Sequence, residues 1–109
     1  MNKYKILPDG TMELNPTYTE ILRLDKMLDE KKIEHEIIRF WDGYRIGIIY
    51  NGREIGDIVQ HYGSYGNTDN LLETMGFDKT DVIGSLTAEQ AMELIKLAIK
   101  RRMNKCTTE

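Results

Sequence analysis

The sequence of 109 residues contains one cysteine, two prolines and no long apolar run. A single cysteine, Cys106, cannot form a disulfide within the chain, which indicates a reducing compartment. No segment approaches the roughly 20 apolar residues that a membrane-spanning helix needs, and residues 1–5 lack the apolar core of a signal peptide. These features together predict a cytoplasmic protein.

Histidine is scarce as well, because His35 and His61 are the only two in the chain. A metal centre needs several convergent His, Cys or carboxylate ligands, and the one cysteine lies in the polar tail. We therefore expect no metal site. No motif of the sequence points to a bound cofactor.

The charges are nearly balanced, with 15 Lys and Arg against 18 Asp and Glu, a net charge of −3. Binding along a nucleic-acid backbone needs a clustered basic surface, so direct nucleic-acid binding is not expected. The length and the share of apolar residues fit one globular domain over residues 1–109. Within it, we expect residues 1–14 to form an N-terminal hairpin or arm and residues 104–109 a frayed tail.

The periodicity of the apolar residues predicts an α+β fold. Asn15-Pro16 suits the start of an amphipathic helix, and Thr87 with Gln90 forms a capping box for another. Asp42-Gly43 and Asn51-Gly52 suit two-residue hairpin turns. The expected elements are a three-stranded antiparallel meander, about 35–41, 44–50 and 53–60, packed with helices about 16–33, 69–75 and 87–103.

Turn length also predicts the strand register. If both turns contain two residues, the numbers of paired residues sum to 85 across the first turn and to 103 across the second. The core face then carries a row of Arg39, Ile46 and Asp57, which is either an ion pair or the edge of a pocket for phosphate or carboxylate. On the other face Gly47 lies opposite Gly56, and this gap indicates coverage by the N-terminal arm or by a second copy.

Two features favour a homo-oligomer. One is the gap on the second face of the sheet. The other is the helix at about 87–103, whose apolar surface is wider than a surface helix of so small a domain needs, with Leu97 on its opposite side.

The loop of residues 61–70 combines rings, hydroxyls, amides and a carboxylate between two glycines. The predicted register brings His61 beside the Asp42 turn. Five rings should therefore gather at one end of the sheet: Trp41, Tyr44, His61, Tyr62 and Tyr65. Such rings can stack a nucleobase while polar side chains bind its edges. The candidate ligand-binding residues are Arg39, Trp41, Tyr44, Arg45, His61, Ser64, Tyr65, Asn67 and Asp69.

Catalytic patterns are weaker. Ser64 and His61 could form a nucleophile and its base, but the sequence lacks a nucleophile elbow. Gly63-x-x-Gly66 precedes a predicted helix start, where backbone N–H groups favour an anion, although the lysine of a P-loop is missing. We therefore predict a binding role without catalytic residues.

Four segments have a distinctive order and spacing: 42–46 (DGYRI), 61–66 (HYGSYG), 71–76 (LLETMG) and 84–90 (GSLTAEQ). In these segments the chain resembles small uncharacterised proteins encoded by phages and prophages of Gram-positive bacteria. The resemblance covers about residues 20–100 and leaves out the N-terminal arm.

Small accessory phage proteins of this kind often counter bacterial immunity, usually by stoichiometric binding. The resemblance therefore implies a non-enzymatic protein of the host cytoplasm that sequesters a nucleotide-type immune signal, in an oligomer whose subunits close the pocket. The alternative is a stoichiometric protein inhibitor of a bacterial defence nuclease, of the anti-CRISPR type, that acts through acidic faces. A nucleotide-processing enzyme and a structural phage protein stay open as further alternatives.

Overall fold

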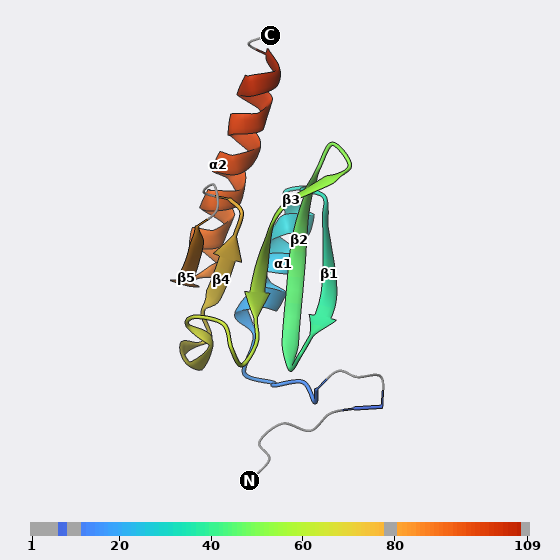
Figure 1. Ribbon diagram of the computed structural model, residues 1–109, viewed down its shortest axis with the longest axis vertical. Helices are drawn as coiled ribbons and strands as arrows, with labels where there is room; N and C mark the ends of the chain where they lie inside the picture. Colours follow the sequence, from blue (N-terminus) through green and yellow to red (C-terminus); the bar gives the residue numbers. More distant parts are fainter. Residues whose placement is uncertain (1–6, 9–11, 78–80, 108–109) are drawn as a thin grey trace.

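The computed structural model describes residues 7–8, 12–77 and 81–107, with side chains up to Asn104 in the last helix. Within these residues the chain forms a five-stranded antiparallel sheet in the order β1-β2-β3-β4-β5, with two α-helices and one 3-10 turn (Figure 1). The α+β fold predicted from the sequence is confirmed. The elements are α1 (Glu20–Glu30), β1 (His35–Phe40), β2 (Gly43–Tyr50), β3 (Arg53–Gln60), η1 (Asn67–Asp69), β4 (Leu72–Met75), β5 (Val82–Leu86) and α2 (Ala88–Thr107).

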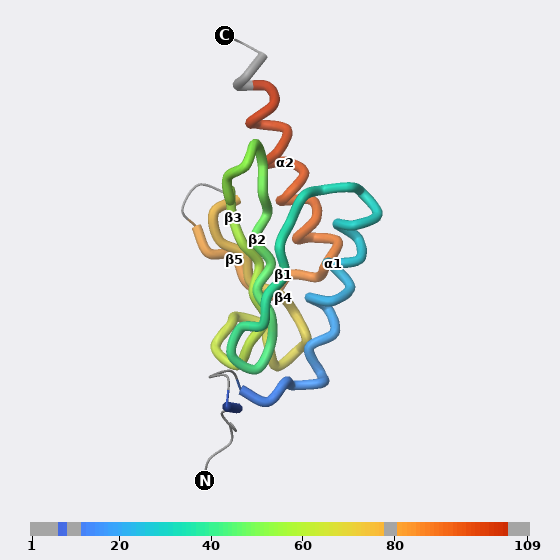
Figure 2. The backbone as a smooth tube through the Cα atoms, turned by 90° about the vertical axis from the view of Figure 1, so that its right-hand side faces the viewer, coloured from blue at the N-terminus to red at the C-terminus, as the bar shows by residue number. Residues whose placement is uncertain are grey.

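Both helices lie on the same face of the sheet (Figure 2). The core lies between the sheet and the two helices. It is built from apolar side chains at helical spacing in α1 and α2 and from alternate residues of the strands. Its fully buried members include Ile21, Leu24, Leu28, Ile46, Ile48, Ile58, Leu72, Ala91 and Ile95.

The first helix is shorter than the predicted span of 16–33. The side chain of Asn15 accepts hydrogen bonds from the N–H and the hydroxyl of Thr17, which holds a turn before the helix. At the other end Lys32 takes a positive φ of 56°, a conformation that ends the helix.

The N-terminus of α1 is capped by residues far along the chain. Asn70 Oδ1 accepts hydrogen bonds from the N–H groups of Thr19 (3.0 Å) and Glu20 (3.2 Å). Gln60 Oε1 accepts one from the N–H of Ile21 (3.1 Å). These side chains satisfy donors that a helix start leaves unpaired, and they fix the loop after β3 against α1.

The second helix has two caps. The predicted capping box is present: the N–H of Gln90 donates to Thr87 Oγ1, and the N–H of Thr87 donates to Gln90 Oε1. In addition Glu20 Oε2 accepts the N–H of Ala88 at 2.7 Å. The start of α2 is therefore joined to the start of α1.

The predicted helix at 69–75 is wrong. Asn70 has a φ of 57°, so the short η1 turn ends there, and Leu72–Met75 forms strand β4 against β3. Burial alternates in β4, with Leu72 and Thr74 inside, a strand period that a four-residue segment shows only weakly. Residues 82–86, for which the sequence predicted no helix or strand, form β5.

The first hairpin turn lies one residue earlier than predicted. The turn residues are Trp41 and Asp42, and the paired numbers sum to 83, as in Phe40 opposite Gly43. Gly43 pairs with Phe40 as the first residue of β2, and the position requires glycine because a Cβ there would lie 1.8 Å from the carbonyl oxygen of Gln60. A shift of two in the sum leaves every side chain of β1 and β2 on its predicted face.

The second hairpin follows the predicted register for two pairs only. Tyr50 pairs with Arg53 and Ile49 with Glu54, and then a bulge shifts the register so that Ile48 pairs with Gly56. A one-residue shift exchanges the two faces of a strand. The rest of β3 therefore presents Ile58 and Gln60 to the helices, with Asp57 and Val59 on the other face.

The bulge overturns two predictions. Asp57 does not share a row with Arg39 and Ile46, because it lies on the opposite face. Gly47 faces Asp57 instead of Gly56. A Cβ on Gly56 would lie 2.7 Å from the ring of Phe77, so this glycine admits the Phe77 ring.

Most of the predicted N-terminal hairpin or arm lies outside the described residues. Of its last part, the N–H of Met12 donates to the carbonyl of Trp41 at 3.2 Å. Just beyond it, the N–H of Asn15 donates to the carbonyl of Asp42 at 2.8 Å. The segment that enters α1 therefore runs along the turn between β1 and β2.

Candidate functional site

The sheet face that points away from α1 and α2 carries the candidate site, and we call it the open face. The register assigns its residues, because side chains alternate along each strand. From β1 to β5 they include Glu36, Ile38, Phe40, Arg45, Gly47, Ile49, Glu54, Asp57, Val59, Glu73, Met75 and Val82. Ile38, Met75 and Val82 are exposed apolar side chains on this face.

Four rings gather where β1 and β3 end, and we call Phe40, Trp41, His61 and Tyr62 the aromatic cluster. Ring centroids are 5.1 Å apart for Phe40 and His61 and 5.8 Å apart for Trp41 and Tyr62, both edge to face. Phe40 and Trp41, and His61 and Tyr62, also meet edge to face. Trp41 is nevertheless 46% exposed and Tyr62 37%, so the cluster offers ring surface to solvent.

A buried carboxylate holds the cluster in place. Asp42 is only 4% exposed. Its Oδ1 accepts the N–H of Tyr62 at 2.9 Å and its Oδ2 accepts the hydroxyl of Tyr18 at 3.2 Å. Because a buried carboxylate requires such partners, Asp42 ties the β1–β2 turn, the loop after β3 and the approach to α1 into one rigid unit.

The Ser64 side chain is hydrogen-bonded to the main chain of His61. Ser64 is 2% exposed, and its hydroxyl donates to the carbonyl of His61 while accepting the N–H of His61. The His61 ring accepts the N–H of Gly63 at Nδ1. Burial lowers the pKa of His61, against the opposing charges of Glu73 and Asp42. The ring is thus neutral near pH 7, and the Ser64 hydroxyl is bonded to backbone rather than to the imidazole.

The remainder of the loop is held by its own hydrogen bonds. Asn67 Nδ2 donates to the carbonyl of Ser64, and the N–H of Tyr65 donates to Glu73 Oε1 at 2.9 Å. The side chain of Tyr65 is 67% exposed, and Asp69 is exposed in η1. The predicted anion site fails on geometry, because residues 72–75 are a strand and η1 spans only three residues.

Arg45 lies on the open face and is held by two carboxylates. Its Nε donates to Asp57 Oδ2 at 2.8 Å, and its Nη2 donates to Glu54. The hydrogen bond to Glu54 is the main cause that raises the pKa of Arg45. With Glu36 and Glu73 nearby on this face, carboxylates outnumber the one guanidinium, and the face is acidic.

Arg39 and Tyr44 point to the helix side. Arg39 Nη2 donates to the carbonyl of Met12 at 2.6 Å and its Nε to the carbonyl of Gly43. Its guanidinium lies 5.7 Å from the centre of the Tyr44 ring. Arg39 therefore holds the N-terminal segment, and its Nη2 also donates to the main-chain carbonyl of Trp41 at 3.4 Å. Neither Arg39 nor Tyr44 belongs to the aromatic cluster.

The structure therefore divides the nine candidate residues. Trp41 and His61 come together in the aromatic cluster, and Arg45 lies on the same face. The sequence prediction expected Tyr62 among the gathered rings without naming it as a ligand residue, and it missed Phe40. The alternation of side chains along β1 could have identified Phe40, because Phe40 and Ile38 lie on the open face in both the predicted and the observed register.

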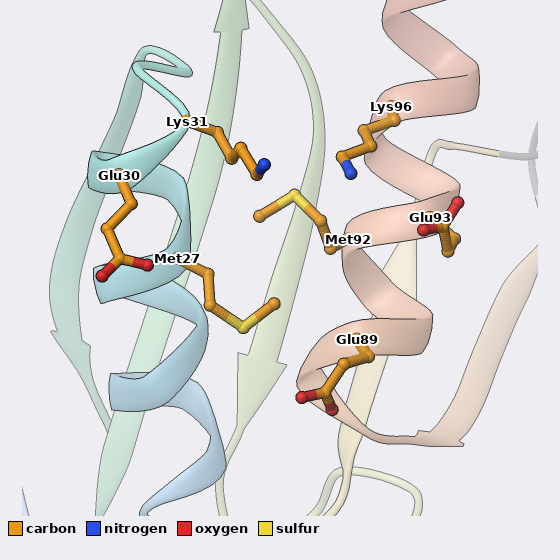
Figure 3. A pocket seen from close by; sticks show the side chains of 7 residues that line it. All are labelled: Met27, Glu30, Lys31, Glu89, Met92, Glu93 and Lys96. Carbon is orange, nitrogen blue, oxygen red and sulfur yellow. The ribbon is translucent and has the colours of Figure 1, made fainter.

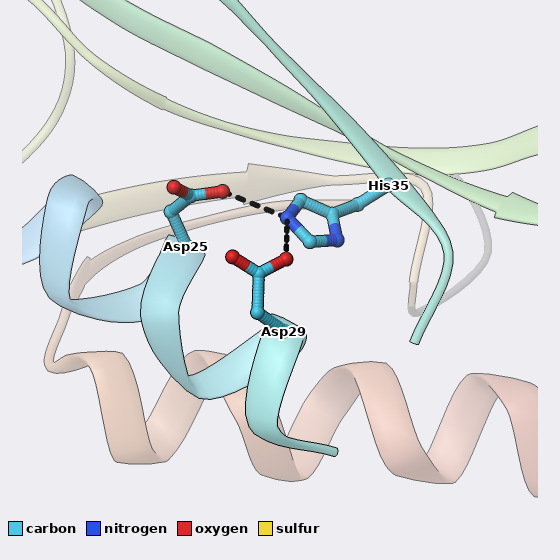
Figure 4. A group of neighbouring side chains, drawn as sticks. All are labelled: Asp25, Asp29 and His35. Atoms are coloured by element: carbon cyan, nitrogen blue, oxygen red, sulfur yellow. Dashed lines mark hydrogen bonds and ion pairs between the residues drawn. The ribbon is translucent and has the colours of Figure 1, made fainter. Parts of the chain in front are cut away.

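One cluster has the residue types of a metal site (Figure 4). His35 Nε2 lies 2.7 Å from Asp25 Oδ1 and 3.5 Å from Asp29 Oδ1, and its Nδ1 lies 2.7 Å from the carbonyl oxygen of Ile33. Burial acts to lower the pKa of His35, but these acceptors outweigh it and the pKa is raised. The geometry is that of an imidazolium between two carboxylates, and a cation there would have to replace the proton on Nε2.

A groove of about 220 Å³ separates α1 from α2 (Figure 3). Met27 and Met92 point toward each other across it, and charged side chains of both signs surround them: Glu30, Lys31, Glu89, Glu93 and Lys96. Arg23 bridges the helices by ion pairs to Glu20 and Glu89. The mixed charges are typical of a solvent-exposed groove between two packed helices.

The chain matches no protein-family model, no curated protein and no solved structure. Among the described residues, no helix is both long enough and apolar enough to span a membrane.

Proposed function

We propose that this protein is a non-catalytic phage counter-defence protein that inhibits a bacterial defence nuclease in the host cytoplasm by binding it. The observation that carries the proposal is the exposed aromatic cluster beside the carboxylates of the open face. The resemblance to phage-encoded proteins supports the counter-defence role.

The composition of the open face suits a protein partner. Tryptophan and tyrosine supply much of the binding energy in protein interfaces, mainly where they are held rigidly and become desolvated. Trp41 and Tyr62 are exposed in the free protein and fixed through Asp42. Carboxylates at Glu36, Glu54 and Glu73 would meet the basic surface with which a nuclease binds nucleic acid, and complementary charge speeds association.

A nucleotide-sequestering protein is the second candidate. The exposed rings of Trp41 and Tyr62 favour it, because a nucleobase can stack on such rings. The open face is less suited to bind the phosphates of a nucleotide. Arg45 is engaged by Asp57 and Glu54, and nearby carboxylates repel an anion. The protein inhibitor therefore has the better electrostatic match.

The test compares Trp41→Ala and Tyr62→Ala with Leu22→Ala, which removes an apolar side chain of similar exposure from α1. Each variant is expressed in bacteria that carry single defence systems, and infection is scored. We expect wild type and Leu22→Ala to suppress one system and both ring variants, folded by circular dichroism, to lose suppression. Full activity of both ring variants would show that the aromatic cluster is the wrong site.

Direct binding separates the two candidates. Purified protein is titrated in a calorimeter with the defence nuclease and with a panel of signalling nucleotides. A stable complex with the nuclease and no heat from nucleotides supports the inhibitor. Heat from one of the nucleotides and none from the nuclease supports the sequestering protein instead. Nucleotide turnover that His61→Ala abolishes would refute the non-catalytic role.

A further inference from the structure

A second surface lies at the other edge of the molecule, where β5 meets α2. Within the described part of the chain, β5 is the last strand of the sheet, and one side of its backbone has no neighbouring strand there. Between β5 and α2 is an apolar groove of about 370 Å³, lined by Ile83, Leu86, Gln90, Glu93, Leu94 and Leu97. Leu97 is 47% exposed at its rim. An apolar groove beside an edge strand is a surface that natural proteins cover or pair.

The second half of α2 extends past the sheet (Figure 1). Residues at helical spacing continue the groove face of α2 toward its C-terminus, from Leu97 to Arg101 and Asn104. All three are exposed. Leu97 is the tenth of the twenty residues of Ala88–Thr107 and therefore lies at the midpoint of the helix.

We infer that the groove binds a second copy of this chain, with the two α2 helices antiparallel about a two-fold axis at Leu97. A two-fold axis at that residue pairs positions whose numbers sum to 194. Leu97 then meets Leu97 of the second copy, Glu93 meets Arg101, and Gln90 meets Asn104. The extended half of each α2 lies along the groove of the other copy.

Charge selects this arrangement. The antiparallel pair makes the Glu93 to Arg101 contact twice, once on each side of the axis, as a self-complementary interface requires. A parallel pair would place Glu93 against Glu93 and Arg101 against Arg101, which like-charge repulsion disfavours. Both residues are exposed in the single chain, and the apolar floor under Leu94 and Leu97 becomes buried only in the pair.

The interface is tested first by sedimentation equilibrium from micromolar to near-millimolar concentration. We expect a reversible dimer for the wild type and a monomer for Leu97→Glu, which keeps its fold because the position is half exposed. Glu93→Arg and Arg101→Glu should each raise the dimer dissociation constant at least about tenfold. The double variant exchanges the charges and should restore dimerisation.

Cross-linking tests the axis in a Cys106→Ser background. Two helices packed 8–10 Å apart bring facing Cα atoms within disulfide reach, so Leu97→Cys should form a linked dimer on mild oxidation. Gln90→Cys is the control, because antiparallel pairing separates the two copies of residue 90 by about 21 Å along the helix axes. A monomeric wild type overturns the inference. So does a dimer that survives Leu97→Glu or that cross-links at residue 90 instead of residue 97.

Discussion

Asn70 provides a test of how the loop after β3 is joined to α1. Its Oδ1 accepts three hydrogen bonds, from the N–H groups of Thr19 and Glu20 and from Gln60 Nε2 at 2.8 Å. Its Nδ2 donates to Thr19 Oγ1. It also has a φ of 57°, which asparagine tolerates better than most residues. Substitutions at Asn70 can therefore separate the cap from the backbone conformation.

The expected losses follow from these contacts. Removing a helix cap costs about 1 kcal/mol, and leaving the fully buried amide of Gln60 without its acceptor costs about 1–3 kcal/mol. Asn70→Gly should thus lower the free energy of unfolding by about 3 kcal/mol. Asn70→Ala should lose about 1 kcal/mol more, because alanine resists a positive φ. Asn70→Asp should stay within about 1 kcal/mol of the wild type, since it keeps the acceptor and adds a charge at the start of α1.

Urea unfolding followed by circular dichroism gives the midpoint and slope for each variant. The predicted order of stability is wild type and Asp, then Gly, then Ala. If Gly and Ala both remained within about 0.5 kcal/mol of the wild type, the hydrogen bonds of Asn70 would not hold the loop to α1. An aspartate variant as unstable as alanine would show that the acceptor is not the essential group.

Two further predictions concern pH and close packing. The raised pKa of His35 contributes stability that is complete below its unfolded value of 6.5 and is lost as the pH rises through the folded pKa. The lowered pKa of His61 contributes above 6.5 and is lost as the pH falls through its folded pKa. The urea midpoint of the wild type should therefore fall as the pH rises above 6.5, and the midpoint of His35→Gln should fall less over the same range. An equal fall in both proteins would contradict the ion pair between His35 and Asp25. Gly43→Ala should cost about 3 kcal/mol or more by backbone overlap. Gly47→Ala would instead displace the carboxyl end of the Glu54 side chain, which is paired with Arg45 at the surface, and should cost less than about 1 kcal/mol. Equal midpoints for the two glycine variants would refute that distinction.

Local patterns in the sequence predicted the first three strands and the start of α2 well. The isoleucine-rich period and the Asn51-Gly52 turn placed the bounds of β2 and β3 to within one residue, and Thr87 with Gln90 formed the expected capping box. In each case residues adjacent in the sequence supply the stabilising contacts. Such features need no knowledge of the tertiary fold.

The misplaced features depend on contacts between distant residues. The backbone at Gln60 approaches Gly43 so closely that only glycine fits there, and the bulge at residue 55 accompanies the packing of Phe77 against Gly56. Strand β4 exists because it pairs with β3, although Leu72, Glu73 and Met75 also suit a helix. None of these causes is visible in a local window of sequence.

The candidate site was predictable to the same degree. His61 and Trp41 lie in one aromatic cluster, each in contact with Phe40 and Tyr62, since a hairpin turn and the end of β3 fix their positions. Arg45 and Asp57 came together only through the one-residue shift at the bulge, which moved Asp57 to the open face. Without the shift, the acidic character of that face could not be assigned.

The linked caps of the two helices imply a direction for local opening. The loop at Asn70 caps α1, and Glu20 in the first turn of α1 accepts the N–H of Ala88 at the start of α2. A helix of 11 residues is marginal alone, so detachment of the loop exposes α1 first and then the start of α2. Opening that begins at the C-terminal end of α2 leaves the loop and α1 closed. Amide hydrogen exchange should therefore be correlated between the loop and α1, and independent of them in the last turns of α2.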